Sequence, residues 1–323
     1  MKTFKSSDYK TFEQIASLSQ KSIKRVMSNF LKKHYKKIIE TDKYIIAEGD
    51  IPVALVAHLD TVFKDPPEEI FFDQTKNVIW SPDGLGADDR AGVFGIVQII
   101  RSGLRPHIIF TTDEEVGGIG ATAVSILDCP FKDLKYIIEL DRRGSNDCVF
   151  YNCDNQEFVN YVESFGFEWN FGSYSDICEI CPSWEVAGVN LSIGYRDEHS
   201  IAEVLFVGKM LSTIEKVKKM LADAKKLKTP FKYIPAYKYS YGYGLDWYNS
   251  PSEVVKCNYC HTYHLADEMI PIVKHDKSTA YCCGDCEPNL AWCIECGNAF
   301  EKYSPEAPEI GTCPFCLEKK ENK

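Results

Sequence analysis

Residues 53–60 read Val-Ala-Leu-Val-Ala-His-Leu-Asp, an apolar run that ends in His58 and Asp60. Such a run is typical of a buried strand. His58 and Asp60 are two positions apart, so their side chains leave an extended chain on the same face. An imidazole that binds a metal usually has a carboxylate on its other nitrogen. The pair therefore marks a candidate metal site, although a plain His–Asp pair in a loop has the same spacing.

Outward from this strand, short apolar runs alternate with helical patterns. The predicted strands span 44–47, 53–57, 78–80, 107–110, 136–140 and 190–194. The predicted helices span 11–39, 91–101, 121–127, 157–165 and 201–225. This alternation indicates an α/β fold, in which a mostly parallel mixed sheet is covered by helices on both faces. We expect a first domain over residues 1–225.

A glycine-rich segment, Asp-Gly-Leu-Gly-Ala-Asp-Asp-Arg at residues 83–90, precedes the predicted helix 91–101. Its glycines allow a tight turn. Acids at a helix start are often favourable caps, which is the simpler interpretation of Asp89. An acid pair flanked by glycines is an unusual cap, and this favours a chemical role for Asp88.

Acidic residues also follow two further predicted strands. Glu114 and Glu115 come after one of them, and Asp141 closes the other. Neighbouring carboxylates repel one another, so a cluster at a strand end tends to be held by a cation. The alternatives are an exposed acidic loop for the first group and a pairing of Asp141 with Arg142 or Arg143.

His199 stands just before the helical pattern 201–225. A lone histidine in such a place is usually structural or capping. In open α/β sheets, however, ligands bind outside the carboxyl ends of the strands, and most of these segments end a predicted strand. We therefore treat all the segments as candidates for one shared site.

In chain order, the segments form a pattern that resembles the co-catalytic zinc exopeptidases. This clan includes peptidase T, the glutamyl and aspartyl aminopeptidases and the bacterial leucyl aminopeptidases. The motifs are HLDTV, GADDRAG, TTDEEVGGIGA, a strand-end Asp, and HS before the last helix, over residues 40–225. The resemblance implies two catalytic zinc ions, or Co²⁺ or Mn²⁺ in their place. The implied metal ligands are His58, Asp88, Glu115, Asp141 and His199.

The resemblance also implies individual roles. Asp88 would bridge both metals, with a cis peptide bond after it, and Asp60 would orient His58. Glu114 would be the general base for a hydroxide shared by the two metals. The chemistry agrees independently, because two zinc ions about 3.5–4 Å apart can polarise a carbonyl and hold its oxyanion. Adjacent Glu114 and Glu115 point to opposite sides of an extended chain, so one can bind metal while the other takes the proton.

The substrate is less well indicated. Only 57 residues separate Asp141 from His199, where relatives with a lid carry an additional domain. The chain thus looks lidless and is similar to the compact aminopeptidase branch, whose Ser-Asp segment matches Ser175 and Asp176. Asp176 is on that ground a candidate substrate contact. Arg196 could hold a substrate carboxylate, which would favour a carboxypeptidase, a dipeptidase or an N-acyl amino acid deacylase.

The preferred expectation is an aminopeptidase that acts on short peptides. The alternative from another class is a non-catalytic adaptor that uses the fold as a scaffold and binds proteins through its tail.

The tail itself is rich in cysteine. No cysteine precedes Cys129, and nine lie from Cys257 onward. Four CxxC pairs within residues 251–323 are typical of two structural zinc sites, each with four cysteines. Sequential pairing would give two zinc ribbons, and interleaved pairing stays open. The predicted ligands are Cys257, Cys260, Cys283, Cys286, Cys293, Cys296, Cys313 and Cys316. Substitute ligands are Cys282, His261 and His264.

Residues 226–250, rich in tyrosine, glycine and proline, are predicted as a linker to this tail domain. From 251 to 323, seven Lys and no Arg stand against twelve Asp plus Glu, a net charge of −5. Zinc ribbons often bind nucleic acid, but phosphate binding needs the opposite sign. A protein contact, self-association or substrate gating fits better.

The whole chain of 323 residues carries a net charge of −10 at pH 7. That balance argues against a general binder of nucleic acid or anionic membranes. The N-terminus lacks the apolar core of a signal peptide, and no stretch approaches the ~18 apolar residues of a membrane span. We expect a cytoplasmic protein whose cysteines are metal ligands or buried thiols. Cys178 and Cys181, another CxxC pair, are more simply two thiols than a third metal site or a disulfide.

Overall fold

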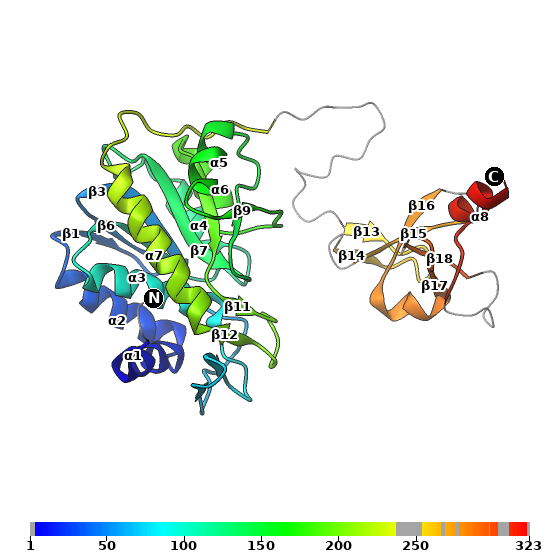
Figure 1. Ribbon diagram of the computed structural model, residues 1–323, viewed down its shortest axis with the longest axis horizontal. Helices are drawn as coiled ribbons and strands as arrows, with labels where there is room; N and C mark the ends of the chain where they lie inside the picture. Colours follow the sequence, from blue (N-terminus) through cyan, green and yellow to red (C-terminus); the bar gives the residue numbers. More distant parts are fainter. Residues whose placement is uncertain are drawn as a thin grey trace. The chain divides into compact units, whose positions relative to one another are not determined.

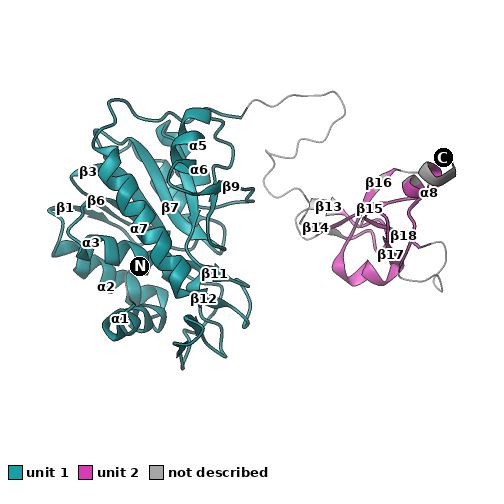
Figure 2. Cartoon of the chain, in the orientation of Figure 1, with its two compact units in different colours: residues 1–238 teal, residues 239–323 magenta. Residues whose placement is uncertain are grey.

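The computed structural model describes residues 4–236, 254–265, 269–275, 278–296, 298–302 and 310–321. The chain divides into two compact units, residues 1–238 and 239–323 (Figure 2). Residues 237–250 of the predicted linker lie outside the described residues. Residues 226–236 belong to unit 1, where Phe231 is buried and its backbone N–H donates to the carbonyl of Lys135. The domain boundaries proposed from the sequence stay predictions.

Unit 1 is built on a central sheet flanked by helices (Figure 1). The described strands of this sheet number eight, in the order β1-β2-β6-β3-β7-β10-β8-β9. These strands are β1 (Lys37–Glu40), β2 (Tyr44–Glu48), β6 (Pro106–Thr111), β3 (Ile51–His58), β7 (Tyr136–Arg142), β10 (Gly188–Ser192), β8 (Asp147–Val149) and β9 (Glu168–Trp169). The central strands β6, β3, β7 and β10 run parallel, while β2 and β8 pair antiparallel at their flanks. The predicted mostly parallel mixed sheet is confirmed.

Helices cover both faces of this sheet, as predicted. Leu55 of β3 faces one apolar cluster and its neighbour Val56 faces the other, because successive side chains of a strand alternate. The first cluster contains residues of α1 (Ser6–Ala16), α2 (Gln20–Lys32), α3 (Ala87–Arg101), α5 (Gln156–Glu163) and α7 (Val207–Ala224). The second contains residues of α4 (Ile119–Ser125) and α6 (Ile177–Trp184).

Three predicted details differ from the structure. The single helix predicted over 11–39 is wrong, because the chain turns between α1 and α2, and Ser19 is extended with φ −63° and ψ 156°. The helix predicted over 201–225 begins only at Val207. Residues 204–206 instead form β12 (Val204–Phe206), in a small sheet ordered β11-β12-β5-β4. Its other strands are β11 (Tyr195–Arg196), β5 (Val78–Trp80) and β4 (Phe71–Asp73). Helix α6, with Pro182 inside it, was not predicted.

Unit 2 is made of small sheets and turns. A pair, β13 (Val254–Lys256) and β14 (Tyr263–Leu265), is followed by a sheet in the order β16-β15-β18-β17-β19. The strands of that sheet are β15 (Ile270–Val273), β16 (Thr279–Cys282), β17 (Leu290–Cys293), β18 (Ala299–Glu301) and β19 (Ile310–Gly311). A 3-10 helix spans Gly284–Asn289, and α8 spans Pro314–Glu321. The buried clusters here are small and hold several cysteines, so metal binding is expected to supply much of the folding energy.

Membrane insertion through a helix is not supported by the described part of the chain. None of its helices combines the length and the apolar character that a crossing requires.

Candidate metal centre

The parallel strands of unit 1 bring the candidate residues to one edge of the sheet. His58 is the last residue of β3, Glu114 and Glu115 follow β6, and Asp141 lies near the end of β7. Asp88 stands in the first turn of α3, which begins after a glycine-rich turn. The carboxyl ends of parallel strands meet at one edge, so these side chains converge as the sequence predicts.

The first donor group contains His58, Asp88 and Asp141. The Nε2 atom of His58 lies 3.1 Å from Oδ1 of Asp88 and 3.5 Å from Oδ1 of Asp141. His58 is fully buried, and both carboxylates are nearly so. The peptide bond between Asp88 and Asp89 is cis.

The second donor group contains Asp88, Glu115 and His199. The Nε2 atom of His199 lies 3.2 Å from Oδ2 of Asp88 and 3.1 Å from Oε2 of Glu115. Asp88 therefore stands between two histidines, with one oxygen toward each. The side chain of His199 is 52% exposed, so this side of the centre is open to solvent.

Glu114 lies beside these groups. One of its carboxylate oxygens comes within 4.8 Å of donor atoms of His58 and Glu115. Burial, together with repulsion from Asp141 and Glu115, raises the pKa of the Glu114 carboxyl to about 8. Glu114 thus lies where a carboxylate can take up a proton from a water held by these donor groups.

Asp60 supports both sides of the centre. Its Oδ1 accepts a hydrogen bond from the backbone N–H of Glu114 at 3.1 Å, and its Oδ2 accepts one from Glu115 at 3.0 Å. Its Oδ1 also lies 3.3 Å from Nδ1 of His58. The sequence suggests only the contact with His58. The structure adds that Asp60 holds the backbone on which the two glutamates stand.

Glu203 is a second supporting carboxylate, and the sequence pattern predicts no role for it. It is buried at 1% exposure, and its oxygens accept hydrogen bonds from the backbone N–H groups of Ala87 and Asp88, each at 3.0 Å. These N–H groups belong to the first turn of α3, which has no partner for them within the helix. Glu203 stands four residues after His199 in the sequence, and that is the only local signal for it.

Hydroxyl groups hold Asp141. Tyr195 donates to its Oδ1 and Ser175 to its Oδ2, each at 3.1 Å. Asn190 donates in turn to the Ser175 hydroxyl at 3.0 Å, and to that of Tyr151 at 3.0 Å. Such partners orient a metal-binding carboxylate, and they come from strands and loops far apart in the chain.

The donor set fits zinc. Imidazole nitrogens and carboxylate oxygens, with sides left open, are the ligands of catalytic zinc sites. Hydrogen bonds with Asp88 and Glu115 raise the pKa of His199 to about 11, which reflects the concentration of negative charge at this point. Oε1 of Glu115 is buried and finds no hydrogen-bond partner among the described residues. A divalent cation would satisfy this oxygen and the crowded carboxylates together.

Arg90 is a buried cation in α3, two residues after Asp88. It is 3% exposed, and its Nη2 donates to the carbonyl of Leu18 at 2.9 Å, in the turn between α1 and α2. Burial lowers its pKa to about 10, opposed by the charges of Asp60 and Asp89. Arg90 therefore stays protonated at neutral pH and offsets part of the local negative charge.

The two candidate substrate contacts, Asp176 and Arg196, differ in their burial. Asp176 is completely buried, and its Oδ2 accepts a hydrogen bond from the hydroxyl of Thr111. Its part in substrate contact stays a prediction. Arg196 lies in β11 with its side chain exposed, three residues before His199.

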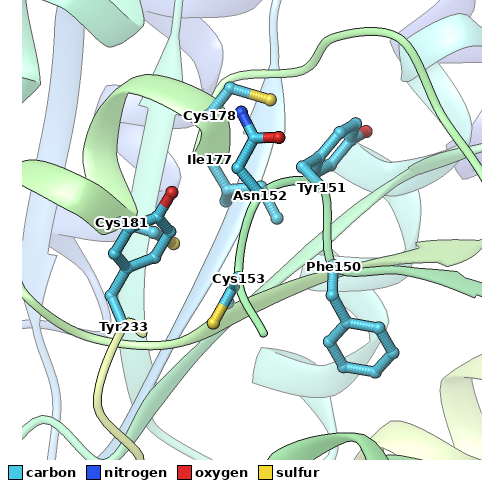
Figure 3. A pocket seen from close by; sticks show the side chains of 9 residues that line it. Phe150, Tyr151, Asn152, Cys153, Ile177, Cys178, Cys181 and Tyr233 are labelled. Atoms are coloured by element: carbon cyan, nitrogen blue, oxygen red, sulfur yellow. The ribbon is translucent and has the colours of Figure 1, made fainter. Parts of the chain in front are cut away.

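Cys178 and Cys181 lie on α6 and, with Cys153, line a cavity of about 20 Å³ (Figure 3). This volume suits a single water rather than a ligand. Burial raises the pKa of each of the three thiols, and thiols of this kind are unreactive. Among the described residues their sulfurs form no metal-binding group, which favours the interpretation as buried thiols.

In unit 2 the cysteines form two groups. The first comprises Cys257, Cys260, Cys283 and Cys286, and the second Cys293, Cys296, Cys313 and Cys316. The pairing is therefore sequential, and the interleaved alternative is wrong. Sγ atoms of Cys260 and Cys283 are 3.7 Å apart, and those of Cys296 and Cys313 are 3.8 Å apart. Four sulfurs at ~2.3 Å around a tetrahedral zinc would be about 3.8 Å from one another.

The substitute ligands stay outside these two groups. Cys282 is buried and its Sγ contacts the carbonyl of Cys283 at 3.3 Å. The Nε2 atom of His264 lies 4.0 Å from Sγ of Cys260, but His264 is not a member of either four-cysteine group. His261 has a positive φ of 60° in the turn that follows Cys260.

Comparison with known proteins gives a fold but no sequence family. Neither a protein-family model nor a curated protein sequence matches the chain. Among solved structures, aminopeptidase PepT from Bacillus cereus is similar, with a TM-score of 0.54 and 14% identity over 68% of this chain and 98% of that chain. A tripeptidase from Staphylococcus aureus has a TM-score of 0.55 and 13% identity over 68% and 98% of the two chains.

A third similar structure comes from an archaeon. An aminopeptidase from Desulfurococcus kamchatkensis has a TM-score of 0.52 and 14% identity, over 69% of this chain and 98% of that chain. At such low identities the likeness concerns the fold alone. Unit 1 thus has the zinc exopeptidase-like fold, with a His/Asp/Glu cluster suited to metal, and a cysteine-rich unit follows it.

Proposed function

We propose that unit 1 is a zinc-dependent exopeptidase that removes residues from the amino end of short peptides. The observation that carries this proposal is the position of Asp88 between His58 and His199, with one carboxylate oxygen toward each. A carboxylate shared in this way is what a two-metal site needs. The fold, which is that of the aminopeptidases described above, supports the same conclusion.

In this proposal the donor groups divide between two metal positions. His58 and Asp141 would hold one ion, Glu115 and His199 would hold the other, and Asp88 would serve both. Zinc is the preferred metal, with Co²⁺ or Mn²⁺ as functional substitutes. When bound, the two ions supply Lewis-acid polarisation of the scissile carbonyl and lower the pKa of a water.

Glu114 is the general base. It takes a proton from the attacking water on its carboxylate and returns that proton to the leaving amine. Asp60 fixes the backbone of Glu114 and Glu115 by accepting a hydrogen bond from the N–H group of each. One glutamate can therefore bind metal while its neighbour moves a proton.

The test uses the zinc-loaded full-length chain with leucine p-nitroanilide and its N-acetylated form. We expect release of nitroaniline from the free-amine substrate only. Glu114→Gln should lower kcat by about 10²-fold or more while the zinc content stays unchanged. Glu157→Gln, which changes an exposed glutamate in the first turn of α5, is the matched control. Equal rates for Glu114→Gln and wild type would overturn the assignment of the base.

Arg196 favours a second candidate on the same centre. Its exposed guanidinium near His199 could pair with the carboxylate of a substrate. The reaction would then be that of a carboxypeptidase, a dipeptidase or an N-acyl amino acid deacylase. Hydrolysis of N-acetyl-leucine, lost in Arg196→Met, would favour this candidate. No turnover of any of these substrates, with zinc bound, would favour the non-catalytic adaptor.

We also propose that unit 2 holds two structural zinc ions and contacts a protein, either a partner or a second copy of the chain. The two four-cysteine groups support the first part. The net charge of −5 over residues 251–323 supports a protein contact over a nucleic-acid contact.

A further inference from the structure

Exposed aromatic side chains gather in the segment 169–174, Trp-Asn-Phe-Gly-Ser-Tyr, which joins β9 to α6. Trp169 is 49% exposed, Phe171 65% and Tyr174 40%. The rings of Trp169 and Phe171 meet edge to face with centroids 4.3 Å apart. Large apolar groups left in solvent as a cluster commonly mark a binding surface.

The backbone that carries these rings is held firmly. Asn170 donates from its backbone N–H to the carbonyl of Cys148 at 2.9 Å, and from its side chain to Asp147 at 3.0 Å. Gly172 lies so close to β8 that a Cβ there would come within 2.9 Å of a methyl carbon of Val149. The rings are therefore presented on an anchored segment, which limits the entropy lost when a ligand covers them.

The segment contacts two residues that lie close in the sequence to residues of the metal centre. Arg142, the neighbour of Asp141, donates to the carbonyl of Phe171 at 2.8 Å. The Tyr174 hydroxyl lies against Gly118, where an added Cβ would come within 1.9 Å of it. Gly118 closes the turn that Glu114 begins, because its N–H donates to the Glu114 carbonyl at 2.9 Å.

Val116 is a further exposed apolar side chain, two residues before Gly118 in the sequence. It follows Glu115 directly and is 69% exposed. The segment 169–174 contains no charged residue. An apolar side chain would gain from burial against these rings, whereas a charged one would lose hydration against them.

We propose that Trp169, Phe171, Tyr174 and Val116 form the wall that recognises the substrate side chain, and that this side chain is large and apolar or aromatic. The inference rests on the proposed exopeptidase activity and names its substrate class. These four residues determine specificity, and none of them is assigned a part in the chemistry.

The first experiment measures binding without turnover. Phenylalaninol and alaninol carry no bond that the enzyme could cleave, so each is titrated calorimetrically into the full-length, zinc-loaded chain. We expect phenylalaninol to bind about tenfold or more tightly than alaninol, as burial of a phenyl group predicts. Phe171→Ala and Tyr174→Ala should each reduce this ratio severalfold. Equal binding of the two ligands by wild type would overturn the proposal.

The second experiment measures turnover of phenylalanine, leucine, alanine and glutamate p-nitroanilides. We expect kcat/KM for the phenylalanine and leucine substrates to exceed that for glutamate by about tenfold or more. The two wall variants should lose more on phenylalanine than on alanine. Phe71→Ala, which removes a 41% exposed ring on β4, should leave every ratio unchanged.

The two experiments distinguish a failure of the proposed activity from a failure of the recognition wall. If no anilide is cleaved while phenylalaninol still binds preferentially, the proposed activity fails and the recognition wall stands. If the anilides are cleaved without preference, the activity stands and the wall is wrong. A change of molecular mass in Phe171→Ala, with both ratios unchanged, would instead assign the surface to contact between protein copies.

Discussion

The carboxylate of Glu203 accepts a hydrogen bond of 3.0 Å from the backbone N–H of Asp88, although the two residues are 115 positions apart in the chain. Its other oxygen accepts from Ala87. Both contacts tie down the first turn of α3, where Asp88 stands between the two histidines of the centre. Glu203 is thus a positioning residue for the donor that both metal positions share.

Glu203→Ala should weaken both the fold and the metal centre. Two buried N–H groups lose their acceptor, and each loss costs about 1–3 kcal/mol of the free energy of unfolding. Glu203→Gln keeps one acceptor oxygen and should lose less. Urea unfolding and zinc competition with a chelator would measure the two effects. Glu157→Ala is the exposed control, and equal stability of all three variants would contradict this role.

Asp60 should matter for turnover more than for stability. Asp60→Asn removes the charge and one of the two acceptor oxygens, so the backbone of either Glu114 or Glu115 loses its support. Loss of such a supporting partner typically costs 10–100-fold in metal affinity or activity. kcat and zinc affinity of Asp60→Asn would be compared with those of Asp154→Asn, an exposed control. Unchanged values would show that Asp60 is dispensable.

Zinc content should separate the two kinds of metal site. We expect about four zinc ions per chain by elemental analysis, two in unit 1 and two in unit 2. The variant His58→Ala/His199→Ala should retain about two, and Cys257→Ser/Cys260→Ser should lose about one. A wild-type value of about two that is unchanged in the histidine variant would mean that unit 1 binds no zinc.

His107 should make stability depend on pH. It is buried at the start of β6, where its ring stacks on Phe131 and its Nδ1 accepts from the N–H of Gly49 at 3.1 Å. Burial lowers its pKa from 6.5 to about 4. The unfolded chain therefore binds this proton first as the pH falls, and stability is lost between pH 6.5 and 4, by up to ~3 kcal/mol.

The measurement is urea unfolding of wild type and His107→Gln at pH 7.5, 5.5 and 4.5. Groups that titrate equally in both proteins cancel in the difference. The advantage of wild type over the variant should shrink as the pH falls. A difference that stays constant across this range would show that His107 carries its proton equally in both states.

Much of unit 1 can be predicted because local sequence patterns mark its central strands. The apolar run that ends in His58 becomes β3, and the acids after the neighbouring strands meet at its carboxyl end. Parallel topology brings strand ends together, so a strand-end residue can be assigned to a shared site without knowledge of its contacts. The four CxxC pairs of the tail likewise predict two four-cysteine groups, although not which pairs share a group.

Other structural features cannot be predicted from local sequence patterns. Apolar periodicity over 11–39 continues through a turn, so the break at Ser19 and the strand β1 could not be distinguished from one helix. Helix α6 carries Pro182 and is short, which weakens its helical pattern. The double role of Asp60 depends on the loop after β6, which lies more than fifty residues later in the chain.

The sequence by itself therefore determined the sheet, the donor types and the strand ends at which they stand, because hydrophobic period and ligand chemistry are properties of short segments. Only the tertiary structure decided that Asp88 faces His58 with one oxygen and His199 with the other. It also decided that Glu203 holds the turn on which Asp88 stands. It decided as well that the first CxxC pair shares a group with the second, and the third with the fourth. Each of these depends on which distant segments pack together, and packing is set by the whole chain rather than by any local run of residues.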